Sequence, residues 1–85
     1  MEMVKDKIER WKLLAELFLN KNIKAYIKEI NGDLHFCDIL FVGEDSVRIY
    51  NYGPAQRAGT KDTLYWINIE DFDEDKNEVK NGQSN

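Results

Sequence analysis

The chain has 85 residues, of which 42% are apolar and 33% charged, and its formal net charge is −4. This length allows one domain with a small core, so an oligomer or a partner surface is an expected source of stability. The single Cys37 excludes an intrachain disulfide and a Cys-rich zinc site, and no apolar run approaches the roughly 18 residues of a membrane span. Without a signal-peptide core near the N-terminus, we expect a cytoplasmic domain with no membrane contact.

The charge is divided unevenly along the chain. Residues 1–28 hold seven Lys or Arg against four Asp or Glu, whereas residues 29–85 hold five against twelve. The simplest interpretation is a basic helix face that complements an acidic tail. The same asymmetry confines any contact with an anionic partner to the first segment or to a loop near Arg57 and Lys61.

The first predicted element is a helix over about residues 3–19. Apolar residues spaced by four and three share one of its faces: Val4, Ile8, Trp11, Ala15 and Phe18. The segment Asn20-Lys21-Asn22 predicts its C-terminal boundary, because Asn suits the residue after a helix and Lys favours the negative helix end. A second apolar stripe predicts either burial on two sides or a covering partner: Leu13, Leu14, Leu17 and Leu19.

Period-two alternation predicts a strand over residues 23–28 and, after the turn residues Asn31-Gly32, a second strand over residues 34–42. Two registers are possible. A two-residue loop pairs Ile27 with Phe36, whereas a three-residue loop that ends at Gly32 pairs Ile27 with His35. We favour the three-residue loop because it forms good cross-strand pairs, which are Ala25 with Cys37, Ile23 with Ile39, Lys24 with Asp38 and Tyr26 with Phe36.

The rest of the chain predicts shorter elements. In order they are a strand over residues 46–52, a long loop over 51–62, a strand over 63–67, a helical bend over 68–70 and a short strand from residue 71. The folded domain is expected to span residues 1–74, and residues 75–85, with one apolar side chain, are expected to be disordered. Trp11 and Trp66 are predicted to anchor the core.

One helix followed by five short strands, with a turn at Gly32 and the closing segment Tyr65–Phe72, resembles the Sm-like family (LSm and Hfq proteins). Ile39 and Val42 lie seven and ten residues after the turn glycine, as in the first motif of that family. The resemblance implies a mainly β fold, with an N-terminal helix and a five-stranded, strongly bent SH3-like small barrel. A family glycine at the bend of the second strand is replaced here by Cys37, which is also small.

The resemblance also implies a function, namely a non-catalytic, ring-forming protein that binds RNA or scaffolds an RNA complex. Family members form rings when the fourth strand of one subunit pairs with the fifth of the next, so a homo-oligomer is expected. The RNA pocket itself does not carry over, because residues 43–47 contain no Asn and residues 66–68 contain no Arg-Gly. The alternative is an assembly module of the same fold that binds protein and no RNA.

Two sets of residues are candidates for these contacts. Aromatic rings beside cations suit single-stranded RNA, although packing of the tyrosines on the barrel explains them as well; this set is Tyr50, Tyr52, Arg57 and Lys61. The second set is expected at an oligomer interface, and it comprises Leu64, Trp66 and Phe72 in the last strands and Leu13 and Leu17 on the helix.

Enzymatic chemistry has little support. His35 and Cys37 share a strand face and would allow a thiolate nucleophile, but a buried thiol beside a partly exposed His is the favoured interpretation. The acidic residues from Asp71 to Asp75 are interpreted as a solvated strand end. We expect no catalytic residues, metal site, cofactor or small-molecule substrate.

Overall fold

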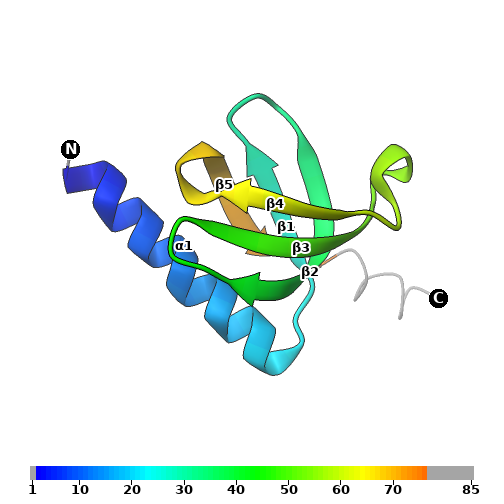
Figure 1. The fold of residues 1–85 in the computed structure, drawn as a ribbon, viewed down its shortest axis with the longest axis horizontal. Coiled ribbons are helices and arrows are strands. Elements are labelled where there is room, and N and C mark those ends of the chain that lie inside the picture. Colours follow the sequence, from blue (N-terminus) through cyan, green and yellow to red (C-terminus); the bar gives the residue numbers. More distant parts are fainter. Residues whose placement is uncertain (1, 77–85) are drawn as a thin grey trace.

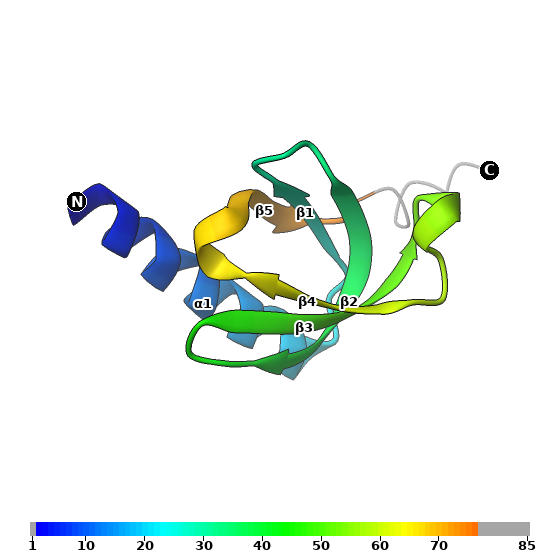
Figure 2. The same ribbon diagram turned by 45° about the horizontal axis from the view of Figure 1, so that its top comes forward.

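The computed structural model describes residues 2–76, with side chains for residues 5–76. The fold is mainly β, as expected: an N-terminal helix packs on an open antiparallel sheet with the strand order β4-β3-β2-β1-β5 (Figure 1). The elements are α1 (Glu2–Lys21), β1 (Ala25–Glu29), β2 (Leu34–Val42), β3 (Ser46–Gly53), η1 (Ala55–Arg57), β4 (Lys61–Tyr65), η2 (Trp66–Asn68) and β5 (Ile69–Glu74). The sheet is strongly curled around its core, as Figure 2 shows for β2.

Helix α1 ends where the sequence predicts. Asn22 adopts a positive φ of 56°, and the Ile23 N–H donates to the Phe18 carbonyl at 2.9 Å, which closes the helix end in a Schellman-type arrangement. Trp11, Ala15 and Phe18 are buried, and Ile8 packs beside them; the side chain of Val4 lies outside the described part. The predicted core-facing helix stripe is therefore confirmed from Ile8 onward.

The first hairpin has the favoured register. Ile27 lies opposite His35 and Ala25 opposite Cys37. The loop has three residues and ends at Gly32, whose φ of 98° is one that side chains rarely adopt. The predicted pair of Ile23 and Ile39 is absent from the ladder, because β1 begins only at Ala25. The pairing of β2 with β3 shifts its register between Phe36 and Cys37 and again between Ile39 and Phe41.

The long loop predicted over residues 51–62 is too long. The predicted strand over residues 46–52 is confirmed as β3, β4 starts two residues earlier than predicted, and the connection is residues 54–60 with η1 inside it. Strand pairing extends to the residue before β4, because the Asn51 N–H donates to the Thr60 carbonyl at 2.8 Å. Thr60, which was predicted to lie in the loop, is thus paired with β3.

The closing strands also lie two residues before their predicted positions. The helical bend is Trp66–Asn68 and β5 begins at Ile69. Trp66, at the start of the bend, and Ile69, at the start of β5, are both buried. Trp11 and Trp66 are both buried, so their predicted role as core anchors is confirmed.

The described residues extend two positions past the predicted end of the folded domain at residue 74. The Asp75 N–H donates to the Lys24 carbonyl at 2.9 Å and so continues the pairing of β5 with β1. The remainder of the predicted disordered tail, from residue 77, lies outside the described residues.

Candidate functional site

The two tyrosines of the predicted RNA set lie together on the outer face of the sheet. Their rings are 5.3 Å apart in an edge-to-face arrangement, and Lys61 of β4 pairs with Tyr50 across the strands. Tyr52 is the more exposed of the two, at 44%. A second ring pair, Tyr26 with Phe36, lies on the same face with a centroid separation of 5.5 Å. This cross-strand pair was predicted from the sequence together with the hairpin register, and it is confirmed.

Tyr52 is already engaged within the chain. Its hydroxyl donates to Asp38, and the Lys24 ammonium lies 4.2 Å from the ring centroid and 3.7 Å from the same carboxylate. The hydrogen bond to Asp38, followed by burial and the Asp38 charge, raises the pKa of the Tyr52 phenol. A nucleic-acid base stacking here would compete with the Lys24 cation–π contact.

Arg57 does not join the tyrosines in a single cationic surface. Its guanidinium lies 3.0 Å from the Asp33 carboxylate at the β1–β2 turn. The predicted RNA residues therefore separate into Tyr50, Tyr52 and Lys61 on the sheet face and Arg57 on the loop. A neighbouring hollow of about 390 Å³ is lined in part by Lys61, Arg48 and the exposed Phe41.

The predicted interface residues divide into two groups. Leu64, Trp66 and Phe72 are 4%, 2% and 3% exposed, so their side chains belong to the core of their own chain. Leu64 of β4, Trp66 of η2 and Phe72 of β5 all point inward, and their place at an oligomer interface stays a prediction. Leu13 and Leu17 are 69% and 42% exposed and remain available.

The free edge of β4 presents unpaired backbone groups. The Trp66 N–H donates to the Asp45 carbonyl and the Asn51 N–H to that of Thr60, so the even-numbered residues of β4 bond to β3. The N–H and C=O of Thr63 consequently point away from the sheet. Within residues 2–76, β4 has β3 as its single neighbour.

The free edge of β5 is different, because its outward N–H groups are capped by neighbouring side chains. The Asp75-to-Lys24 bond places the outward N–H groups on Phe72 and Glu74. Asp71 Oδ1 accepts from the Phe72 N–H at 2.9 Å, and Asp73 Oδ1 accepts from the Glu74 N–H at 2.7 Å. The acidic cluster is solvent-exposed, as interpreted from the sequence, but two of its members also satisfy backbone donors.

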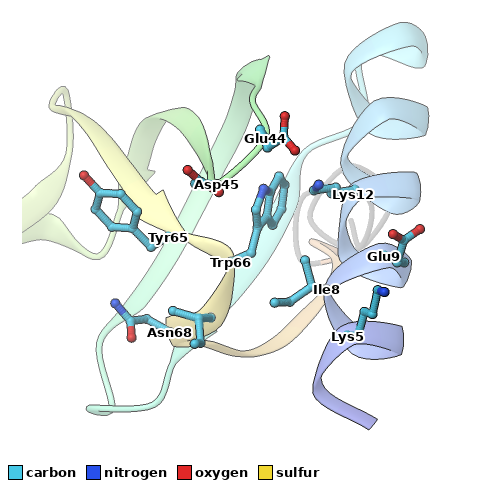
Figure 3. Close-up of a pocket in the computed structure, with 10 residues that line it drawn as sticks. Lys5, Ile8, Glu9, Lys12, Glu44, Asp45, Tyr65, Trp66 and Asn68 are labelled. Atoms are coloured by element: carbon cyan, nitrogen blue, oxygen red, sulfur yellow. The ribbon is translucent and has the colours of Figure 1, made fainter. Parts of the chain in front are cut away.

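A groove of about 670 Å³ runs between α1 and the end of β4 (Figure 3). Trp66 stands in its centre, with Ile8 and Lys12 of the helix across from it, while Tyr65 points away from the helix. The Trp66 indole N–H donates to the Gly43 carbonyl at 3.1 Å. The groove therefore has an apolar floor and lies next to the free β4 edge.

A buried polar chain crosses the inner side of the sheet. His35 is 1% exposed, so the expectation of a partly exposed His is wrong. Its ring nitrogens contact Glu29 and Asn51, both at 3.1 Å, and Asn51 contacts Asp62 at 2.6 Å. The sequence could have indicated that Asn51 is buried, since Asn51 shares a strand face with Val47 and Ile49.

Cys37 lies beside His35 on β2 but is unsuited to nucleophilic chemistry. Burial, followed by the charges of Asp38 and Asp75, raises the pKa of the Cys37 thiol from 9.0 to about 12. The thiol is therefore protonated at neutral pH, and the thiolate is the reactive form. This supports the interpretation of Cys37 as a buried core residue.

Comparison of the sequence with protein-family models and with curated proteins gives no match. Among the described residues, no helix combines the length and the apolar content required to cross a bilayer. In the same part of the chain, no three His, Cys, Asp or Glu side chains gather as ligands for a metal ion.

Proposed function

We propose that this protein is a non-catalytic, Sm-like subunit that assembles with its own copies, β4 of one copy pairing with β5 of the next. The observation that carries the proposal is the open sheet, whose two free edges are different strands. A contact between two different edges is heterologous, and repetition of such a contact gives a ring when the rotation closes. Ring closure and the SH3-like barrel form are parts of the proposal.

The two edges also differ in charge in a complementary way. All four acidic side chains of β5 are exposed: Glu70, Asp71, Asp73 and Glu74. At the opposite edge of the sheet, the exposed Lys61 lies on β4 and the exposed Arg48 lies on its neighbour β3. Pairing of the edges would bring cations to carboxylates and satisfy the outward backbone groups of Thr63.

The solution mass of the protein, measured by light scattering, tests this proposal. We expect a defined multiple of the 10.0 kDa chain mass. Thr63→Pro removes the outward N–H while leaving the β3 ladder intact, so it should reduce the mass to that of one chain. Thr63→Val is the matched control and should assemble as the unmodified protein does. A monomeric unmodified protein, or an assembly unaffected by Thr63→Pro, contradicts the proposal.

Single-stranded RNA is proposed as the ligand of such an assembly, on the outer face. The Tyr50–Tyr52 ring pair beside Lys61 supports it, because exposed rings stack on bases and nearby cations contact phosphates. A ring would repeat this small site once per subunit. The overall acidic charge and the Arg57–Asp33 pair limit the cationic surface available to RNA.

Filter binding to U-rich and A-rich oligonucleotides, at low and moderate salt, tests the RNA proposal. Retention should increase as salt falls, because phosphate contacts release counterions. Tyr52→Ala should weaken retention, whereas Tyr52→Phe keeps the ring and should bind. An absence of retention at low salt contradicts RNA binding.

The protein-interaction alternative uses the exposed helix face instead. Leu13 and Leu17 are four residues apart and so form one patch on α1. This alternative predicts that Leu17→Glu changes the solution mass while leaving the fold intact, and that Thr63→Pro has no effect on it. The two variants therefore distinguish the edge from the helix as the assembly surface.

A further inference from the structure

In the buried polar chain around His35, the donor and the acceptor of each hydrogen bond on the Asn51 side can be identified. Thr60 Oγ1 donates to the Arg57 carbonyl at 2.7 Å, so it accepts from Asn51 Nδ2 at 3.1 Å. Asn51 Nδ2 also donates to Asp62 Oδ2 at 2.6 Å. These contacts orient the amide, and Asn51 Oδ1 is therefore the acceptor that faces His35 Nδ1.

The other ring nitrogen faces a second acceptor. Glu29 Oε1 lies 3.1 Å from His35 Nε2, and an ionised carboxylate can only accept. An imidazole between two acceptors satisfies both only when each ring nitrogen carries a proton. The resulting positive charge, although buried, is compensated by direct contact with Glu29.

We propose that the Glu29–His35–Asn51–Asp62 chain is a proton-dependent clamp, in which a doubly protonated His35 ties β4 and the 54–60 loop to β1. A neutral imidazole has one N–H, so on deprotonation one of its two contacts becomes a pair of facing acceptors. Imidazole is the side chain that changes charge most readily between pH 5 and 8. The clamp is therefore closed when the His35 ring carries two protons and loosened when it carries one.

The groups around the imidazole are consistent with one proton controlling the clamp. Glu29 faces it from β1, and Asp62 of β4 is connected to it through Asn51. The remaining charged pair at this end of the sheet, Arg57 with Asp33, is separate and internally compensated at 3.0 Å. Because Arg57 and Thr60 belong to the clamped loop, the clamp regulates a loop next to the β4 edge, whether or not copies assemble.

The experiment measures ring protonation and loop stability in the full chain. Ring-nitrogen NMR of the ¹⁵N-labelled protein should show protons on both His35 nitrogens at acidic pH. The Gly59 amide donates to the Asn51 carbonyl at 2.8 Å and reports on the loop. After correction for intrinsic exchange, its protection should fall roughly tenfold when the His35 ring changes from two protons to one, as expected for one lost hydrogen bond.

Glu29→Gln is the matched control. The Gln carboxamide can donate to an unprotonated Nε2, so a neutral imidazole with its proton on Nδ1 satisfies both contacts. Gly59 protection should then be independent of pH. A neutral His35 in the unmodified protein at acidic pH overturns the proposal, as does an unchanged pH response in Glu29→Gln; the ring-nitrogen result requires no variant.

Discussion

The two free edges of the sheet, β4 and β5, differ in how their outward backbone groups are bonded. At β5, Asp71 and Asp73 cap the outward N–H groups of the next residues, whereas at β4 the outward groups of Thr63 have no equivalent neighbour carboxylate bonded to them in the described structure. Capping by side chains is one way in which proteins restrain edge pairing. The difference teaches that the two edges are not equivalent, because the outward N–H groups of Phe72 and Glu74 are already bonded, so edge pairing of the kind we propose would require β5 to release its caps.

The largest expected effect comes from truncating Trp11, the helix residue that packs against β5. Trp11 of α1 stacks on Phe72 of β5 with a centroid separation of 5.9 Å. Trp11→Ala should cost about 3–5 kcal/mol of unfolding free energy, the range for truncation of a buried aromatic. Urea unfolding measures the loss, and Leu13→Ala on the exposed face should change stability by less than about 0.5 kcal/mol. A loss under about 1 kcal/mol for Trp11→Ala would place this ring outside the core.

A second prediction concerns Cys37 of β2, in the middle of the sheet between the two edges. Because burial raises its pKa from 9.0 to about 12, the folded state favours the neutral thiol. The stability from this group is fully present below pH 9 and is lost as pH rises toward 12, by about 1.4 kcal/mol per pH unit. The difference in urea stability between the unmodified protein and Cys37→Ala isolates this dependence. A difference that is constant with pH would show that the pKa of the Cys37 thiol is the same in the folded and unfolded states.

Removal of the β5 caps should sharpen the contrast between the edges. The double variant Asp71→Ala with Asp73→Ala leaves the outward N–H groups of Phe72 and Glu74 free to bond to a neighbouring strand. The matched control is the double Asn variant, which also lacks the two charges but keeps a capping oxygen. Relative to that control, the Ala variant should self-associate about threefold to tenfold more tightly, the value of a net hydrogen bond. Sedimentation equilibrium measures the difference, and equal association of the two variants argues against edge pairing through β5.

The smallest expected effect lies in the loop beside β4. Arg57 and Asp33 form a partly exposed ion pair, so Arg57→Ala should cost less than about 1 kcal/mol of stability. Thermal unfolding at low and high salt measures it, and Arg57→Lys, which keeps the charge, should be closer to the unmodified protein. A larger loss in Arg57→Ala would show that this pair carries more of the loop's stability than its exposure indicates.

The local elements were predictable to different degrees. The helix end at Asn22 and the three-residue loop at Gly32 followed from backbone preferences that these residues carry with them. The predicted bounds of the last two strands were wrong because the apolar residues Trp66 and Ile69 fit the strand pattern whether a strand begins at these positions or two residues away. The loop 51–62 was drawn too long because Gly53 and Gly59 are turn signals whichever strand residues flank them.

The sequence by itself determined the helix and the first hairpin, since periodicity and turn chemistry are local properties, and it favoured one of two hairpin registers, between which the structure decided. The tertiary structure decided which polar groups meet, because hydrogen bonds across strands depend on the curl of the sheet. His35, Asn51 and Asp62 lie far apart in the sequence, and their side chains meet only when β2, β3 and β4 pair in one curled sheet. The contrast between the two edges has the same origin: the order of the strands in the sheet left β4 and β5 unpaired.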